Sequence, residues 1–472
     1  MNELAEMILA VADWLTLYVT MWALAGVGIF LTVVTRGVQF RHFWHMCKTV
    51  VVSREGAKGG ISSFQAFTIS LAARVGVGNV FGVAAALLVG GPGAVFWMWV
   101  VAAVGMATSF VESTLAQIFK VRDEDGTFRG GPAYYMWKGV GSRVYGAVFA
   151  VTTVITCAFV ITSVQSNAIA GTLIAAMPST SAWVVAALLF AFAGPIILGG
   201  IRSVARVTEW MAPIMATIYL GMALAICLLN ISALPHLFAE IFRSAFTGAA
   251  LGGGTAGGVL AAIINGTKRG LFSNEAGQGT APNAAATATV SHPVKQGFIQ
   301  SLGVFVDTIL VCTATAFVIL LAGPAVWNGE GVNPGNLTTL AITAHLGQWV
   351  QIPMALMIFV LAFSSIIAAY VYSEVNMSFV TSAAWGRWAV RILSVFSTCL
   401  GAIVTLDVAW NAVDIAMAVM TVTNLTALVI LHKWVVGALK DYESQIKRGI
   451  SDPRFVAKDS QFLPRPLQSE IW

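Results

Sequence analysis

The feature that most constrains this fold is a succession of apolar segments, each about as long as a membrane-spanning helix, that fills most of the 472-residue chain. A helix of about 20 apolar residues crosses the hydrocarbon core of a bilayer. Charged residues make up only 10% of the chain, which sets it apart from soluble domains, where roughly 25% are charged. The sequence therefore predicts an all-α polytopic membrane protein with eleven transmembrane helices, at 13–35, 63–89, 93–119, 144–175, 181–200, 207–230, 255–290, 296–322, 350–376, 388–406 and 411–433.

The Lys and Arg residues give this arrangement an orientation. If the N-terminus is outside, all 26 of them lie in cytoplasmic loops or the tail except Arg74, Arg243, Lys268 and Arg269. Such a bias is the positive-inside rule. It predicts a multi-pass protein with the N-terminus outside and the C-terminus in the cytoplasm. The expected location is the plasma (inner) membrane of a prokaryote. Because membrane topology accounts for the net charge of +5, this charge does not indicate a nucleic-acid partner.

Two of the predicted segments are interrupted by polar and flexible residues. The segment at 255–290 contains Asn274, Glu275 and Gln278 together with Gly277 and Gly279. Backbone groups freed at mid-membrane are tolerated only where they face protein or a water-filled cavity. We therefore expect a helix broken at a binding site; a loop between two short helices outside the membrane is the alternative.

The second interruption lies in the segment at 63–89, where Arg74 precedes Gly76, Gly78 and Asn79. Both breaks contain Gly-x-Gly, and paired Gly-interrupted segments in two halves of a chain point to the substrate site of a secondary transporter. Without the first span, ten remain, five beginning at each break. Because five is odd, the second five enter from the opposite side, and the two sets form inverted repeats.

This reading divides the chain into five parts. They are an extra N-terminal helix and cytoplasmic loop (1–60), the first five-helix repeat (61–232), an extracellular loop with an interfacial helix at 235–250 (233–254), the second repeat (255–433) and a cytoplasmic tail (434–472). The two breaks are expected to lie side by side and antiparallel at mid-membrane.

Broken helices suit a zwitterion, because free N–H groups stabilise an anion and free carbonyls accept from an ammonium group. The N–H groups of Val77, Gly78 and Asn79 are expected to hold a carboxylate. The carbonyls around Arg74, Phe272 and Ser273 are expected to hold an ammonium group. Close helix packing is the alternative role for the glycines. Gln165, on an apolar span, is a further ligand candidate or else a clamp between helices.

A cation site is expected near the centre of the 350–376 span. The hydroxyls of Ser364 and Ser365, with the carbonyls of Ala72, Val75 and Leu361, form an oxygen set that suits sodium. Each serine could instead donate to the carbonyl one turn earlier in its own helix.

Several motifs resemble the sodium:alanine symporters, the alanine or glycine:cation symporter family. The resemblance extends from about Phe64 to Leu431 and rests on Phe64-Gln65-Ala66, 74–79 (RVGVGN), 90–99 (GGPGAVFWMW), 130–135 (GGPAYY) and 273–279 (SNEAGQG). It implies a LeuT-type five-plus-five core and sodium-coupled import of alanine or glycine by alternating access. By this similarity Phe272, Ser273, Glu275 and Gln278 line the pocket, with Phe272 as its lid or wall.

The resemblance implies Na⁺ as coupling ion. We expect a monomer in membrane lipid and no cofactor. Three alternatives remain: a carrier of another small zwitterion or nucleobase driven by Na⁺ or H⁺, a non-transporting amino-acid sensor, and a membrane enzyme using Glu275 as base. The sequence has no nucleophile–base pair, metal cluster or phosphate loop, so we do not expect an enzyme.

Two buried charges need partners, because an isolated charge in the bilayer core costs at least about 2.5–3.5 kcal/mol. Arg74 lies at the first break and Asp307 near the middle of 296–322. We hypothesise that they pair and that the Arg74 guanidinium replaces a second cation, leaving one sodium per substrate. Contact of Arg74 with Glu275 or with water is the alternative.

Overall fold

The computed structural model describes all residues except 1–6, 8–9, 13, 53–59, 124–125, 248–257, 328, 405–406, 459 and 468, and it also leaves out the side chains of 407–412. Arg54 and Lys58, which contribute to the predicted charge bias, lie outside the described residues. So do the first residues of the predicted 255–290 segment and the end of the predicted interfacial helix.

The regular secondary structure of the described chain is helical apart from one short hairpin. Its first part comprises η1 (Leu15–Thr20), α2 (Met21–Val34), α3 (Val38–Arg41), α4 (Phe43–Val52), α5 (Ser63–Arg74), η2 (Gly78–Gly82), α6 (Val83–Gly90), α7 (Gly93–Ile118), β1 (Val121–Arg122), β2 (Phe128–Arg129), α8 (Pro132–Tyr135), η3 (Met136–Val140), α9 (Arg143–Ile155), η4 (Thr156–Ile161), α10 (Thr162–Ala176), α11 (Ala182–Leu198) and α12 (Ile201–Leu229).

The second part continues with helices and ends in an irregular tail. It comprises η5 (Ile231–Ala233), α13 (Leu234–Thr247), α14 (Gly258–Asn274), α15 (Ala281–Thr287), α16 (Pro293–Val304), η6 (Phe305–Cys312), α17 (Thr313–Ala322), α18 (Pro324–Trp327), α19 (Leu337–Leu346), η7 (Gln348–Val350), α20 (Gln351–Val380), α21 (Ala384–Ile403) and α22 (Asp407–Lys447).

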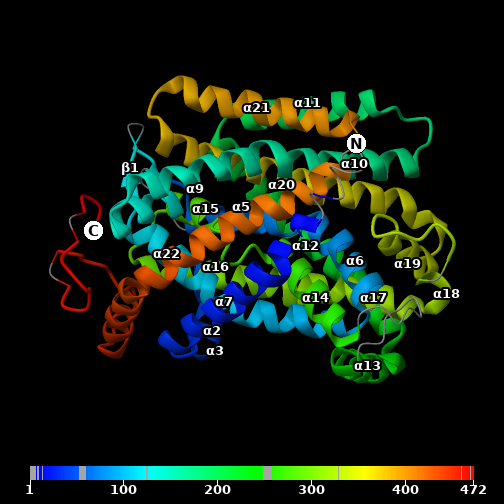
Figure 1. The fold of residues 1–472 in the computed structure, drawn as a ribbon, viewed down its shortest axis with the longest axis horizontal. Coiled ribbons are helices and arrows are strands. Elements are labelled where there is room, and N and C mark those ends of the chain that lie inside the picture. Colours follow the sequence, from blue (N-terminus) through cyan, green and yellow to red (C-terminus); the bar gives the residue numbers. More distant parts are fainter. Residues whose placement is uncertain are drawn as a thin grey trace.

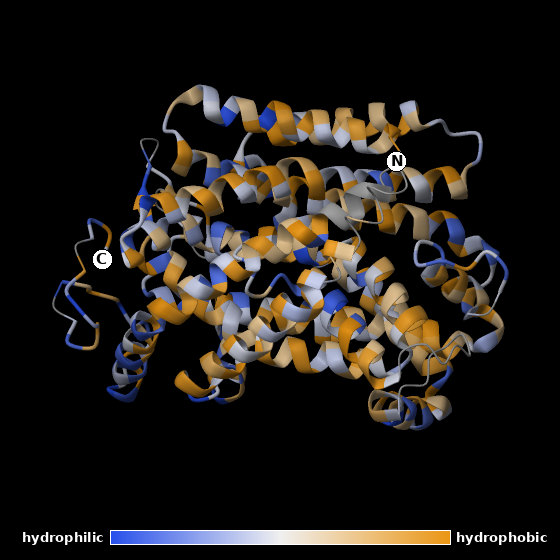
Figure 2. Ribbon diagram, viewed as in Figure 1, coloured by the Kyte–Doolittle hydropathy of each residue, from blue (hydrophilic) through white to orange (hydrophobic). Residues whose placement is uncertain are grey.

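The helices are stacked in layers with their axes mostly along the long dimension of the molecule (Figure 1). The pair α11 and α21 packs on α10 and α20, and α20 packs on α5, while α14 and α16 pack on α7 at the opposite side of the core. Hydrophilic residues gather toward the two ends of the long dimension, with apolar residues between them (Figure 2). This pattern fits helices that cross a bilayer along that dimension.

Among the described residues, seven helices are long and apolar enough to cross a membrane, or eight when the bent pair α5 and η2–α6 counts as one span. The other three predicted segments are also helical. The helix α11 has only 17 residues, α14 and α15 are separated by a break, and α21 has 20 residues with an amphipathic pattern. The structure thus supports membrane-length helices without establishing the count of eleven.

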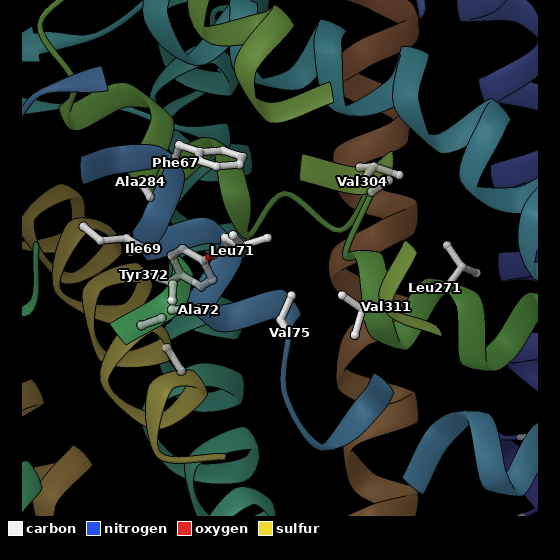
Figure 3. Close-up of a cluster of buried hydrophobic side chains, with 14 of the residues drawn as sticks. Phe67, Ile69, Leu71, Ala72, Val75, Leu271, Ala284, Val304, Val311 and Tyr372 are labelled. Atoms are coloured by element: carbon white, nitrogen blue, oxygen red, sulfur yellow. The ribbon is translucent and has the colours of Figure 1, made fainter. Parts of the chain in front are cut away.

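Both predicted interruptions are breaks in helical structure. The first segment is bent by 46° between α5 and the helix that begins at Gly78. Figure 3 shows Val75 at the end of α5, where the chain leaves the helix and then turns into the next one. In the second segment α14 ends at Asn274 and α15 begins only at Ala281. Freed backbone groups therefore lie inside the protein at both places, as expected.

The helix α22 is longer than the sequence indicates. It continues to Lys447, so the predicted tail at 434–472 begins inside a helix. The extension is held by Trp434, Val435, Ala438 and Leu439, whose spacing places them on one buried face. After residue 433 the helix is amphipathic and no longer uniformly apolar. A helix boundary predicted from hydropathy alone is therefore placed too early.

Candidate functional site

The first break is organised by Asn79. The N–H of Gly76 donates to Asn79 Oδ1 at 2.9 Å, and the N–H of Asn79 donates to the carbonyl of Gly76 at 3.2 Å. The Asn79 N–H is therefore already used and does not point to a carboxylate. Among the described residues the Val77 N–H has no hydrogen-bond acceptor, which leaves it available to an anion.

The second break is a stretch of left-handed backbone. Glu275 has φ 56°, Gly277 has φ 86° and Gly279 has φ 80°. Glycine adopts this conformation without penalty, whereas Glu275 is a non-glycine residue held there by its surroundings. Its carboxylate accepts from the hydroxyl of Thr280 at 2.8 Å and from that of Tyr372 at 3.5 Å.

The two breaks are in direct contact. The Asn79 side chain donates to Ser273 Oγ at 2.9 Å, joining η2 to the end of α14. A Cβ on Gly78 would lie 2.9 Å from Phe272 Cδ1, so only glycine allows the backbone to approach this ring so closely. These contacts confirm the expectation that the breaks lie side by side.

A small cavity of about 20 Å³ lies between the breaks and α20. Arg74, Gln165, Phe272 and Glu275 line it, as do Gly76, Gly78, Ser365 and Tyr372. A volume of this size holds about one water molecule. This conformation is therefore contracted, and an amino acid can enter only if the walls move apart.

Phe272 also lines a much larger cavity. We call this cavity the vestibule. Its volume is about 790 Å³, and its lining residues include Phe81, Asn167, Arg269, Asn336 and Thr339. Phe272 is shared by the vestibule and the small cavity. Phe272 thus lies between the two cavities, and its role as lid or wall stays a prediction.

Not all predicted ligands face the small cavity. Val77, Asn79, Ser273 and Gln278 do not line it. The Gln278 amide instead donates at 2.9 Å to the Leu271 carbonyl, which also accepts from the Glu275 N–H at 3.0 Å. This is a correction to the expectation for Gln278 in the present conformation, and its cause is the left-handed backbone of the second break, which turns the chain back so that Gln278 contacts the end of α14.

Five oxygen atoms gather where α20 passes the end of α5. The Ser364 hydroxyl lies 3.0 Å from the Ala72 carbonyl and 2.7 Å from the Leu361 carbonyl. The Ser365 hydroxyl lies 3.1 Å from both the Ala72 and Ala73 carbonyls. We call these five atoms, with the two hydroxyls and three carbonyls, the oxygen cluster.

The oxygen cluster differs from the expected cation ligands at one position. The carbonyl of Ala73 takes part, whereas no contact places Val75 in it. The reason is geometric, because α5 ends at Arg74 and the carbonyls of its last turn lack helical partners. A set of neutral oxygens fits a hard cation such as sodium.

The expected direct pair of Arg74 and Asp307 is not formed. The Arg74 guanidinium donates to the Gln300 carbonyl at 3.1 Å and to Ser109 Oγ at 3.2 Å. The Asp307 carboxylate accepts from Asn79 at 2.7 Å, from Ser273 at 2.8 Å and from Thr308. Arg74 thus donates to neutral groups and Asp307 accepts from neutral groups, with no direct contact between the two charges, so the one-sodium hypothesis loses its structural basis.

The chain matches the family model described as the sodium:alanine symporter family over residues 1–457. The protein belongs to the sodium:alanine symporter family. It is 45% identical to the amino-acid carrier protein AlsT of Bacillus subtilis (strain 168), with 96% of this chain and 94% of AlsT aligned. A sodium/proton-dependent alanine carrier protein of Bacillus sp. (strain PS3) is 37% identical over 86% of this chain and 94% of that relative.

A further relative and a solved structure complete the comparison. The Bacillus subtilis (strain 168) protein named "Probable sodium/glutamine symporter GlnT" is 42% identical, with 96% of this chain and 94% of GlnT aligned. The crystal structure of MhsT in complex with L-phenylalanine superposes with a TM-score of 0.57 at 14% identity, covering 80% of this chain and 91% of MhsT. The fold is thus that of LeuT-type transporters, and the protein is a membrane-integral bacterial transporter rather than an enzyme.

Sequence reasoning missed five residues that line the small cavity of this family member: Ala73, Ile161, Ala369, Tyr372 and Met417. Tyr372 lies seven residues after Ser365 on α20, two helical turns along the same face, and this spacing could have identified it. Ile161 and Met417 also line the cavity. They carry no signal in the sequence, because an apolar cavity wall looks the same as any other apolar helix position.

Proposed function

We propose that the protein imports a small neutral amino acid, alanine or glycine, coupled to sodium by alternating access. The observation that carries this proposal is the meeting of two broken helices at a cavity that also reaches the oxygen cluster. Ser365 belongs to both, since it lines the cavity and contacts the carbonyls of Ala72 and Ala73. Substrate and ion would therefore bind on adjoining surfaces of α5 and α20, which is the requirement for coupling.

The proposed substrate site uses groups of both charges. The backbone at Gly78 and the Arg74 charge, which both line the cavity, suit a carboxylate. The free N–H of Val77 lies outside the present cavity and would join the site when the cavity opens. The Glu275 side chain and the carbonyls at the end of α14, near Phe272 and Ser273, suit an ammonium group. Gln165 has a buried Oε1 without a hydrogen-bond donor, so it offers a further acceptor.

The size of the cavity favours a short substrate side chain. Ile161, Phe272 and Met417 form its apolar walls, and its volume is about 20 Å³ in this conformation. Moving these walls apart by the small amount needed for alanine disturbs less packing than glutamine would require. We therefore propose alanine or glycine as the substrate, although one relative bears the name of a glutamine symporter.

The proposed ion site is the oxygen cluster of Ala72, Ala73, Leu361, Ser364 and Ser365. Opening the cytoplasmic side would separate α5 from α20 and disperse these ligands. Sodium binding would accordingly stabilise the conformation with a closed cytoplasmic side, and sodium release would follow opening.

Proton coupling is a second candidate, supported by an excess of buried acidic groups. Glu112, Glu275 and Asp307 are all buried, and Arg74 is the buried cation whose charge acts on each of them. An uncompensated negative charge in a membrane protein favours binding of either a metal cation or a proton. A proton could then serve in place of sodium.

We further propose eleven spans, with an N-terminal helix preceding two inverted repeats of five. The repeats would occupy 61–232 and 255–433 and begin at the two breaks. The N-terminus would lie outside and the C-terminus in the cytoplasm of a bacterial inner membrane, with a monomer as the functional unit. The LeuT-type fold supports this arrangement.

Uptake of radiolabelled alanine into proteoliposomes tests the proposal. We expect accumulation under an inward sodium gradient and none when potassium replaces sodium at constant pH and membrane potential. Uptake driven only by an inward proton gradient would favour proton coupling. Binding of alanine without accumulation in any gradient would instead indicate a sensor, and excess unlabelled glutamine should compete far less than excess glycine.

A further inference from the structure

The end of the molecule that carries β1 and β2 contains a basic pocket separate from the transport site. The pocket has a volume of about 200 Å³ and lies where the hairpin, the start of α9 and the link between α20 and α21 come together. β1 and α9 are both seen near this end in Figure 1. Four arginines line the pocket together with one acidic residue: Arg122, Arg129, Arg143 and Arg387 with Asp123.

Only one of these arginines is neutralised by an acidic residue of the described chain. Arg129 is buried and contacts Asp123 at 3.0 Å and Glu374 at 3.8 Å. Arg122, Arg143 and Arg387 form no ion pair with any described residue. The hairpin turn also contains Glu124 and Asp125, which lie outside the described residues.

Two helix ends add to the positive potential. Arg143 is the first residue of α9, and Arg387 lies in the first turn of α21. Neither first turn contains an acidic residue. A helix N-terminus carries a partial positive charge, so arginines at these positions are unfavourable unless an anion lies nearby.

The surroundings of the pocket contain aromatic residues that are typical of the membrane interface. Trp385 and Trp388, at the start of α21, are 66% and 51% exposed. Trp137 lines the pocket itself, and the Arg143 guanidinium lies 5.5 Å from its ring centre. Tryptophan concentrates at the level of lipid headgroups, and basic pockets between helix ends at that level bind anionic headgroups.

We propose that this pocket binds the phosphate group of an anionic phospholipid, held by Arg122, Arg143 and Arg387. The hydroxyls of Ser378 and Ser382, which line the same pocket, can donate to further phosphate oxygens. The acyl chains would extend along the apolar surface of α21. This site is independent of the proposed transport chemistry.

Native mass spectrometry of the purified full-length protein tests the proposal with dioleoyl phosphatidylglycerol and dioleoyl phosphatidylcholine as probes. The wild type should retain phosphatidylglycerol preferentially. The triple variant Arg122→Gln, Arg143→Gln and Arg387→Gln should lose this retention by at least about tenfold, given the contribution of each arginine near a lipid surface. The matched control is Arg206→Gln, Arg448→Gln and Arg454→Gln, which removes three exposed arginines outside the pocket and should retain the lipid.

A second variant separates a built pocket from general surface attraction. Ser382→Trp fills the pocket at an exposed position and leaves every arginine in place; it should also lose phosphatidylglycerol. Equal losses in the pocket and control triple variants, or full retention by Ser382→Trp, would overturn the proposal. Displacement of the lipid by millimolar inorganic phosphate would likewise overturn it, since the site would then recognise a free anion.

Discussion

At the residue scale, the site depends on positions where a side chain is missing. A Cβ at Gly76 would collide with the Ser365 hydroxyl, and one at Gly78 would press on Phe272. The two glycines of the first break therefore make different contacts. Gly76 lets α20 bring Ser365 to the last carbonyls of α5, and Gly78 lets the first break reach the second.

The oxygen cluster gives the first prediction. Changing Ser364 and Ser365 together to Ala removes both hydroxyls and leaves the three carbonyls. We expect the sodium concentration for half-maximal alanine uptake to rise by about tenfold or more, because each lost ligand to a charged group contributes on the order of 1.5–3 kcal/mol. Ser373→Ala is the control, since Ser373 is buried in α20 but donates only to the Ala369 carbonyl. Unchanged sodium dependence in the double variant would rule out this site.

Lys120 gives a prediction about pH. Burial, with a smaller effect of the Arg122 charge, lowers the pKa of Lys120 from 10.5 to about 7. Between about pH 7 and 10.5 the side chain is then neutral in the folded protein and protonated in the unfolded chain. Because the unfolded state binds the additional proton, the contribution of Lys120 to stability rises with pH across this window.

The measurement is a melting temperature at pH 6 and pH 9. The wild type should gain stability relative to Lys120→Met as the pH rises, whereas it should not gain relative to Lys447→Met, which changes an exposed lysine. A constant difference between wild type and Lys120→Met would show that the Ala288 carbonyl and the Phe128 and Trp472 rings, which contact the ammonium group, keep it protonated.

At the element scale, α14 and α22 are joined by an ion pair beside the site. Lys268 Nζ lies 2.9 Å from Asp414 Oδ2, and both side chains are nearly buried. Lys268 lies one helical turn before Phe272, and Asp414 lies three residues before Met417, so each residue has a cavity-lining neighbour on its own helix. The pair thus fastens the two helices close to the wall between the vestibule and the small cavity.

Breaking this pair should affect stability and transport together. Lys268→Met leaves a nearly buried carboxylate without this partner, and removal of one member of a buried pair costs about 3–5 kcal/mol. We expect a lower melting temperature and a reduced maximal uptake rate for Lys268→Met and for Asp414→Leu. The double variant should recover part of the stability, and a double-mutant cycle measures the coupling. Additive losses would mean that the two charges act independently.

At the scale of the whole molecule, the vestibule and the end of α22 are predicted to be accessible from opposite sides of the membrane. Thr339 lines the vestibule. Arg448 directly follows the last residue of α22, Lys447. The bias of Lys and Arg predicts that the α22 end lies in the cytoplasm. In a background without the five native cysteines, Thr339→Cys should react with a membrane-impermeant maleimide in intact cells.

Arg448→Cys should react with the same reagent only after the cells are opened. Sodium and alanine together should slow the reaction of Thr339→Cys if binding closes the vestibule, whereas labelling of Arg448→Cys in opened cells provides a reference for reagent activity. Reaction of Arg448→Cys in intact cells would contradict the proposed orientation.

The sequence by itself determined the class of the protein and the positions of the two breaks. Apolar runs predict helices because backbone groups in a bilayer must satisfy one another, and Gly-rich polar interruptions predict breaks for the same reason. The breaks at Gly76–Asn79 and Ser273–Gly279 can therefore be predicted from the sequence alone. The sequence also identified the family, because the motifs typical of that family surround the same breaks.

Only the tertiary structure decided which groups meet. It directed Arg74 to Ser109 and the Gln300 carbonyl rather than to Asp307, and it placed the Ala73 carbonyl in the oxygen cluster. It also brought Met417 to the small cavity from a distant part of the chain. Differences of a fraction of an ångström in the distance between helices decide which hydrogen-bond partner a buried polar group finds. Helical periodicity specifies which face of a helix is buried, but it does not specify which residues of another helix pack against that face.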